Sequence, residues 1–223
     1  MADFVDGLQV PFDAKETAAA LVGFFPALNP EAQQMSLELY RLLEKGEPVP
    51  IHRLAERLAR HSDEVAKTLR TWPGVFFDQH GNVIGYWGLS PTYETTHRLR
   101  TDGRTLYAWC AWDTLFLPAL LGKSAEVESA SPRTRTSIRV TVAPDGVRNV
   151  EPDGVVMSFV MPDRDKLQEN VLTSFCHFLH FFPSRDEGEA WVAEHPGARV
   201  HSLAPAFELG RHKNRLQYPD FVT

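Results

Sequence analysis

Hydrophobic residues in the first third of the chain recur at helical spacing. A helix is predicted after Asn29-Pro30-Glu31, where an N-cap residue, a proline suited to the first helical position and an acid follow one another. Two shorter helices are predicted from Pro50 and from Ser62, because apolar residues return there every three or four positions. The chain therefore opens with a helical segment.

Short apolar runs then replace the helical spacing. Val75-Phe-Phe and Val83-Ile84 lie on either side of the turn sequence Gln79-His-Gly-Asn, which predicts a β-hairpin. Three helices followed by a hairpin are typical of a winged-helix segment. We therefore predict a helical, winged-helix-like domain over residues 1–90. Residues 91–104 are polar and are predicted to be a linker.

Residues 105–121, TLYAWCAWDTLFLPALL, are almost entirely apolar, and Gly122 follows them. A helix that is apolar on every side must be buried, so the run predicts a buried helix. Pro118 has no backbone N–H and is expected to end or kink this helix just before itself.

Alternating apolar and polar residues predict strands in the last part of the chain, at residues 137–142, 147–150 and 155–160. The aromatic run at residues 177–182 is expected to be extended. Short helices are predicted near residues 187–194 and 207–216. The second domain, residues 105–223, is therefore predicted to be α+β, with an antiparallel sheet and flanking helices.

Composition and charge narrow the functional classes. The 223 residues are 43% hydrophobic and 23% charged, as in ordinary globular proteins. The formal net charge of -6 argues against non-specific binding to nucleic acid. The third predicted helix carries Lys67 and Arg70 but also Asp63 and Glu64, so a structural or interaction role is favoured over DNA recognition.

No apolar run reaches 18 residues, and the first residues carry acids and no basic n-region. We therefore expect no membrane span, no secretory signal and a cytoplasmic location. The sequence also lacks a Gly-rich phosphate loop, a G-x-S-x-G elbow and an H-E-x-x-H helix. No cofactor is expected.

Candidate chemistry centres on Cys110 and Asp113. On a helix, a three-residue offset places a thiol and a carboxyl on the same face. A carboxylate in so apolar a segment must find a hydrogen-bond donor or take a raised pKa. Asp113 is therefore either a structural acid, bonded to a backbone N–H or an arginine, or a functional acid beside one of only two cysteines.

The other cysteine, Cys176, also lies among apolar residues. If the two thiols meet in the fold, they form a pocket suited to a soft, thiophilic metal ion that accepts few ligands. His177 and His180 could extend this to a zinc site, although half-buried strand positions are the favoured interpretation of both. The competing interpretation of the two thiols is that they are ordinary buried small residues.

Two stretches carry a resemblance to a known family. Residues 105–122, TLYAWCAWDTLFLPALLG, and residues 174–182, SFCHFLHFF, closely resemble the organomercurial (alkylmercury) lyase family. The helical front half, Glu151-Pro, the helix around Trp191 and the segment Ala206-Phe-Glu-Leu-Gly are similar to it as well, so the resemblance covers most of the chain. One departure is that His177 stands where members of the family often carry a further cysteine.

The resemblance implies an enzyme of mercuric resistance and detoxification that cleaves the carbon–mercury bond of organomercurials by protonolysis. It places the catalytic cysteines on Cys110 and Cys176 and the catalytic acid/base on Asp113, with mercury as the substrate metal that these residues hold. It also implies that the Hg(II) product passes to cellular thiols or to mercuric reductase. Trp112, between the catalytic residues, either shapes the substrate pocket or packs the core.

Two other functions remain open from the residues alone. One is a carrier that binds a soft metal through the same thiols without breaking a bond. The other is a metal-responsive regulator that uses the winged-helix half on DNA and the thiols as a sensor, although the acidic balance argues against it.

Overall fold

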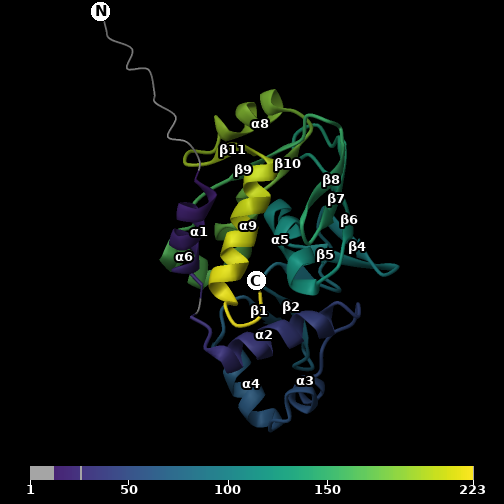
Figure 1. Cartoon of the computed structure of the whole chain (residues 1–223), viewed down its shortest axis with the longest axis vertical. Coiled ribbons are helices and arrows are strands. Elements are labelled where there is room, and N and C mark those ends of the chain that lie inside the picture. Colours follow the sequence, from purple (N-terminus) through teal and green to yellow (C-terminus); the bar gives the residue numbers. More distant parts are fainter. Residues whose placement is uncertain (1–12, 26, 223) are drawn as a thin grey trace, which may run out of the picture.

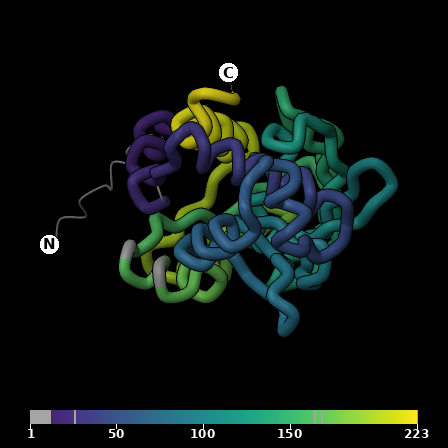
Figure 2. The backbone as a smooth tube through the Cα atoms, turned by 90° about the horizontal axis from the view of Figure 1, so that it is seen from below, coloured from purple at the N-terminus to yellow at the C-terminus, as the bar shows by residue number. Residues whose placement is uncertain are grey.

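The computed structural model describes residues 13–25 and 27–222, so the first 12 residues of the predicted winged-helix domain lie outside the described residues. Figure 1 shows helices α2, α3 and α4 at one end of the molecule and the sheets with their helices at the other. Figure 2, which views the chain from below, shows α2 to α4 lying across that end.

The front segment has the predicted winged-helix order. It comprises α2 (Pro30–Leu43), α3 (Ile51–Leu58), α4 (Ser62–Thr71) and the hairpin of β1 (Val75–Phe77) and β2 (Val83–Tyr86). Asn29 caps α2, since its side-chain oxygen accepts a hydrogen bond from the Ala32 N–H at 2.9 Å. A preceding helix, α1 (Ala14–Val22), lies apart from these and packs along the last helix of the chain.

The wing hairpin continues into a larger sheet. The further strands are β3 (Leu89–Ser90), β4 (His97–Thr101), β5 (Arg104–Ala108), β6 (Ala125–Ala130), β7 (Ser137–Ala143) and β8 (Gly146–Glu151). They join the hairpin in one antiparallel sheet with the order β1-β2-β3-β5-β4-β6-β7-β8. The front segment and the rest of the chain therefore share a sheet.

The predicted linker over residues 91–104 is wrong in its second half, where the chain forms β4 and the start of β5. His97, Leu99 and Thr101 are buried, whereas Arg98 and Arg100 between them are exposed. This is the period-two alternation of a strand with one face in the core. The arginines on the exposed face gave the segment its polar, linker-like composition.

The predicted buried helix begins later than expected. Residues 104–108 are β5, and the helix is α5 (Ala111–Leu121), which is buried along nearly its whole length. Pro118 lies inside α5, yet the helix continues to Leu121. Burial of side chains such as Leu117 and Leu120 stabilises the structure by about 1.5–3 kcal/mol each. Together they offset the local cost of about 3 kcal/mol for an internal proline.

A smaller sheet and several short helices complete the fold. The sheet has the order β10-β9-β11, formed by β9 (Val156–Phe159), β10 (Phe181–Phe182) and β11 (Arg199–Ser202). The helices are α6 (Arg164–Glu169), α7 (Val171–Ser174), α8 (Arg185–Val192), α9 (Leu203–Gln217) and the 3₁₀ turn η1 (Cys176–Phe178). Helices α5 and α9 pack side by side (Figure 1). The predicted α+β class with an antiparallel sheet is confirmed.

The aromatic run after Cys176 is not extended as predicted. It begins as the 3₁₀ turn η1, and only Phe181–Phe182 form a strand. Two hydrogen bonds close the turn: the Phe178 N–H donates to the Phe175 carbonyl at 3.0 Å, and the Leu179 N–H donates to the Cys176 carbonyl at 3.1 Å. A run of large apolar side chains does not by itself distinguish a strand from a buried turn.

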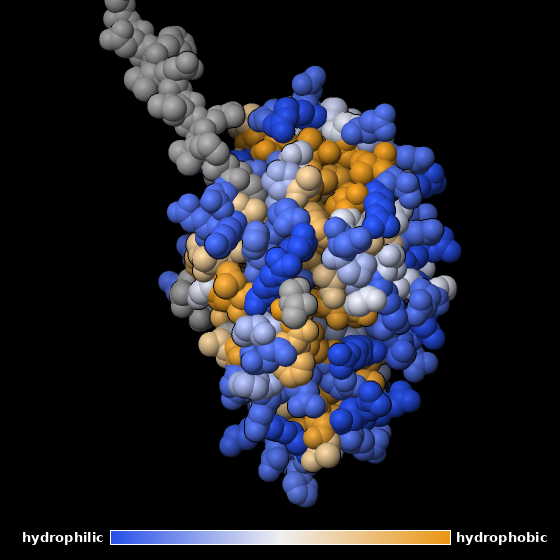
Figure 3. All heavy atoms as spheres, viewed as in Figure 1, coloured by the Kyte–Doolittle hydropathy of each residue, from blue (hydrophilic) through white to orange (hydrophobic). Residues whose placement is uncertain are grey.

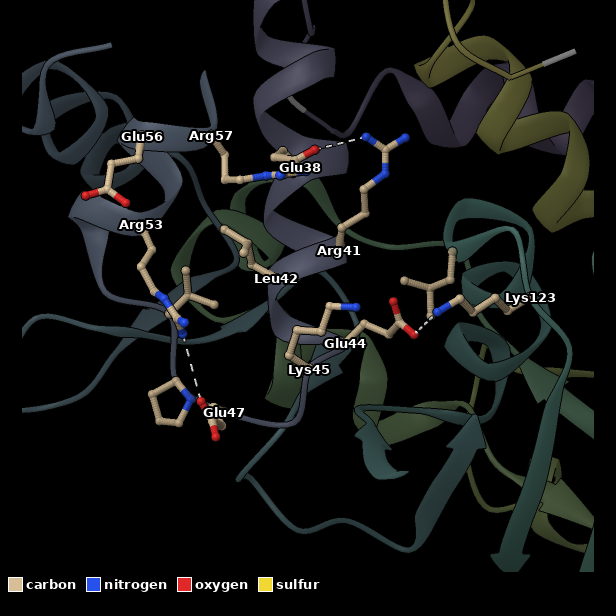
Figure 4. Close-up of a pocket in the computed structure, with 13 residues that line it drawn as sticks. Glu38, Arg41, Leu42, Glu44, Lys45, Glu47, Arg53, Glu56, Arg57 and Lys123 are labelled. Carbon is tan, nitrogen blue, oxygen red and sulfur yellow. Dashed lines mark hydrogen bonds and ion pairs between the residues drawn. The ribbon is translucent and has the colours of Figure 1, made fainter. Parts of the chain in front are cut away.

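A hollow of about 740 Å³ lies where α2 and α3 meet the end of α5 (Figure 4). Glu38 at its wall pairs with Arg57 at 2.7 Å and with Arg41 at 3.0 Å, and Lys123 pairs with Glu44 at 2.5 Å. Both signs of charge therefore line this surface. Neither cysteine lies in the hollow, so the candidate chemistry must be sought elsewhere.

Hydrophilic side chains are spread over the face shown in Figure 3, with apolar atoms among them. Within residues 13–25 and 27–222, no helix has the length and apolar character that crossing a bilayer requires.

His97 on β4 makes stability depend on pH. Burial lowers its pKa from 6.5 to about 3, and its Nδ1 lies 2.8 Å from the Ser129 hydroxyl. As pH falls below 6.5, this histidine is protonated in the unfolded chain but stays neutral in the folded chain. The free energy of unfolding therefore decreases, by about 2 kcal/mol at pH 5. His180 and His201, whose pKa values burial lowers to about 4, add to the decrease. In urea unfolding at pH 7.5 and pH 5, His97→Gln should therefore make the decrease smaller by about 2 kcal/mol. The same change at exposed His52 should leave it intact.

Candidate active site

The first cysteine and the carboxyl meet at the start of α5. Cys110 is the N-cap residue of α5, with extended backbone, and Asp113 is its third helical residue. The Asp113 Oδ2 accepts a hydrogen bond from the Cys110 N–H at 2.8 Å. The two side chains therefore lie together as predicted, but through the capping arrangement of a helix start and not as two residues within one helix.

The second cysteine reaches the same place through the turn η1. The Ala111 N–H at the start of α5 donates to the Leu179 carbonyl at 3.1 Å, and the Leu179 N–H closes the turn onto Cys176. The ligand atoms of Cys110, Asp113 and Cys176 all lie within 4.8 Å of one another. This is about twice a zinc–thiolate bond of about 2.3 Å, so both sulfurs can reach one soft ion.

Both thiols are free and buried, and both are held in the protonated form. Burial raises the pKa of the Cys110 thiol well above its usual range, and the adjacent Cys176 and Asp113 act in the same direction. The hydrogen bond to Cys110 lowers the pKa of the Cys176 thiol, but burial together with the Asp113 charge outweighs it and the net direction is upward. Neither cysteine is a thiolate at neutral pH without a base.

Asp113 has the acidity that such a base requires. Burial raises the pKa of its carboxyl to about 6, and hydrogen bonds from Cys110 and the charge of Lys213 limit the rise. At neutral pH the group is therefore mostly ionised. It remains close enough to its titration point both to accept a proton and to return it.

Lys213 on α9 is a site residue that the sequence did not reveal. It is 2% exposed, and its Nζ lies 3.7 Å from the centre of the Phe116 ring. Burial lowers the pKa of this ammonium to about 7, and Asp113 partly opposes that shift. A signal did exist, because Lys213 follows Leu209 by one helical turn on the buried face of the last helix.

The site opens into a cavity of about 10 Å³, which is at most large enough for one water molecule. Asp113, Cys176 and Lys213 line the cavity, whereas Cys110 is fully buried behind it. Aromatic side chains form much of the wall, namely Phe25, Trp87, Trp109, Trp112, Phe116 and Phe175. A ligand larger than water can enter only if some of these side chains move.

The zinc alternative finds no support in the placement of the histidines. The described part of the chain holds one group of three or more His, Cys, Asp or Glu residues with converging ligand atoms, and it consists of Cys110, Asp113 and Cys176. His177 is exposed, and the His180 ring is 2.7 Å from the His177 carbonyl oxygen. The cluster therefore offers two thiols and one carboxyl.

Trp112 combines the two roles that the sequence left open. It lines the cavity, yet it is only 1% exposed and its Nε1 donates to the Ala206 carbonyl at 3.1 Å. Its ring also meets those of Phe116 and Phe159 edge to face, at centroid distances of 4.9 and 5.7 Å. Trp112 therefore both lines the cavity and packs in the core against α9.

The chain joins a winged-helix segment to an antiparallel sheet. At the start of a central helix it brings together two buried thiols and a carboxyl, a donor set suited to a soft metal. Comparison with known proteins identifies the family. The sequence profile of alkylmercury lyase matches residues 91–213, and that of the helix-turn-helix domain of alkylmercury lyase matches residues 26–87. The chain belongs to the alkylmercury lyase family.

Individual relatives agree with this assignment. An alkylmercury lyase of Staphylococcus epidermidis is 42% identical over 174 residues, which are 78% of each chain. One from Pseudomonas putida is 40% identical over 180 residues, or 81% of this chain and 82% of the relative. A crystal structure of the mercury-bound form of MerB2 superposes with a TM-score of 0.70 at 25% identity, over 91% of this chain and 98% of that one. The resemblance seen in the sequence is confirmed, and the chain is an enzyme that cleaves the carbon–mercury bond of organomercurials.

Removing the charge of Lys213 should shift the pH dependence of the enzyme. Because its ammonium lowers the Asp113 pKa, Lys213→Met should raise that pKa above 6. Less carboxylate is then present at pH 6–7, so the acidic limb of kcat/KM against pH should move to higher pH, with recovery in alkaline buffer. Arg215→Met, an exposed change on the same helix, should leave the profile in place. An unshifted profile for Lys213→Met would show that Lys213 does not influence the group that sets the acidic limb.

Proposed function

We propose that Cys110, Cys176 and Asp113 perform the protonolysis and that the two sulfurs retain the Hg(II) product. The observation that carries this proposal is the convergence of two protonated thiols and an ionised carboxyl within 4.8 Å of one another. Two soft sulfur donors suit mercury, and one carboxyl with a pKa of about 6 suits a group that must first accept and then donate a proton.

The proposed steps account for every proton of the reaction. The Asp113 carboxylate accepts the proton of a thiol as that sulfur bonds to mercury and displaces the ligand opposite the organic group. Asp113 then passes this proton to the carbon as the carbon–mercury bond breaks. As a carboxylate again, it accepts the proton of the second thiol while that sulfur bonds to mercury. Of the two thiol protons, one leaves in the hydrocarbon and the other passes from Asp113 to solvent. Hg(II) remains bound to two thiolates.

The cavity favours one order of attack. Cys176 lines it beside Asp113, whereas Cys110 lies behind at 0% exposure. We infer that an incoming organomercurial meets Cys176 first and that Cys110 completes the two-sulfur coordination. The aromatic wall then surrounds the organic group and keeps water from the carbon–mercury bond.

The product requires an acceptor. Two thiolates hold a soft ion strongly, so release of Hg(II) needs competing thiols. Cellular thiols and mercuric reductase are the proposed acceptors, because a dithiol can exchange with both cysteines in turn. The proposed steps use no cofactor.

A hydrocarbon-release assay tests this function. The purified protein is incubated with phenylmercury and excess cysteine, and benzene is measured by gas chromatography. We expect benzene in amounts that exceed the enzyme concentration, with Hg(II) recovered as its cysteine complex. Stoichiometric retention of intact phenylmercury without benzene would instead support a soft-metal carrier.

A further inference from the structure

The turn between β2 and β3 has an unusual backbone. It consists of Trp87 and Gly88, whose φ angles are +28° and +94°, and it links Tyr86 to its strand partner Leu89. Two-residue turns with both residues at positive φ usually hold Asn-Gly or similar pairs. A bulky residue in the first position is strained, so other contacts must hold the turn in place.

Three backbone groups of the turn are held by neighbours. The Tyr40 hydroxyl, from α2, donates to the Trp87 carbonyl at 2.8 Å. The Trp87 N–H donates to the Gly74 carbonyl at 3.1 Å, and the Trp109 N–H donates to the Gly88 carbonyl at 3.0 Å. The last bond ties the turn to the residue that directly precedes Cys110.

Gly88 lies against the carboxyl of Asp113. A Cβ at position 88 would stand 2.5 Å from both Cγ and Oδ1 of Asp113, which no real contact allows. The other oxygen, Oδ2, is held by the Cys110 N–H. The Gly88 backbone therefore packs against one side of the carboxyl, and the Cys110 N–H holds the other.

We propose that the Trp87–Gly88 turn is a positioning element of the active site, which holds the Asp113 carboxyl in the geometry for proton transfer. The inference rests on the proposed role of Asp113. It gives the winged-helix half a part in the reaction, since Tyr40 and the turn both belong to that half. A displacement of about 1 Å in a catalytic group can cost about 100-fold in rate.

The test compares two glycines in the turns at either end of β2. Gly88→Ala introduces a methyl group against Asp113, whereas Gly81→Ala, at a φ of +79°, introduces one into open space. Both changes carry the backbone strain of an alanine at positive φ. We expect Gly88→Ala to lower kcat for phenylmercury by at least about tenfold with KM within about twofold, and Gly81→Ala to change neither.

A double-mutant cycle separates positioning from general damage. If Gly88 acts through Asp113, Gly88→Ala should cost much less on an Asp113→Asn background than in the wild type, measured as single-turnover benzene release. Tyr40→Phe removes one hydrogen bond to the turn and should lower kcat by several-fold without changing KM. This variant decides the question if Gly88→Ala does not fold.

Three results would overturn the proposal. They are equal losses for Gly88→Ala and Gly81→Ala, full additivity in the cycle, and an unchanged kcat for Tyr40→Phe. The wild-type protein is assayed in parallel. If it releases no benzene, the proposed function itself fails. If the wild type and Gly88→Ala are both fully active, only the positioning role of the turn is rejected.

Discussion

Cys110→Ser or Cys176→Ser should abolish the release of benzene from phenylmercury. Each change removes one of the two soft donors that the mechanism needs, because a hydroxyl neither ionises readily nor binds mercury well. We expect a loss of at least about 1,000-fold in kcat/KM, equivalent to about 4 kcal/mol in the barrier. The measurement is benzene by gas chromatography, with circular dichroism and thermal unfolding to confirm that each variant folds. Full activity in either variant would contradict the two-sulfur mechanism.

The same two variants report on the order of attack. In Cys110→Ser the thiol that lines the cavity remains, so phenylmercury should still form a one-to-one adduct that mass spectrometry detects on the intact protein. In Cys176→Ser the remaining thiol is fully buried, and adduct formation should be much slower. The opposite pattern would place Cys110 first.

Asp113→Asn should bind the organomercurial but fail to protonate its carbon. The amide keeps the size of the carboxyl, and its oxygen can still accept the 2.8 Å hydrogen bond from the Cys110 N–H, so the start of α5 should persist. The amide cannot carry a proton between sulfur and carbon. General acid–base catalysis is worth about 10²–10⁴-fold, and we expect kcat to fall within that range.

The control for this variant is Asp186→Asn, which makes the same chemical change in the exposed first turn of α8. It should leave kcat and KM unchanged. Phenylmercury binding by Asp113→Asn can be followed by the loss of titratable thiols. Turnover at the wild-type rate would show that the proton comes from another group. Loss of binding together with a lowered melting temperature would assign Asp113 to the folding of the site.

The sequence was sufficient to predict α2 to α5, α8, α9 and the wing, but not α1, α6 or α7. The family resemblance singled out the three residues of the cluster. Helix caps such as Asn29 and the period-two pattern of strands depend only on neighbouring residues, so they can be recognised without knowing the fold. The unusual acid at 113 stood out because its neighbours are apolar. That the sulfurs of Cys110 and Cys176 converge required the structure, since 65 residues separate them and no periodicity encodes a tertiary contact.

The residues that support the cluster were not predicted, because their roles also depend on tertiary contacts. Lys213 was not predicted, although it follows Leu209 by one helical turn, and the packing of α9 on α5 buries it. Gly88 was not predicted either, because its contact with Asp113 joins the turn before β3 to the start of α5, and a tertiary contact leaves no local signal. The supposed linker failed because exposed arginines concealed the alternation of β4.

The continuity of the main sheet from β2 through β3 to β5 limits how this chain can be divided. A fragment that begins at residue 91 would leave β5 without its partner β3 and so present a row of unsatisfied backbone groups, a template for self-association. It would also lack Gly88, which packs against the carboxyl of Asp113. The two halves are therefore expected to fold as a unit, although their sequence motifs look separate.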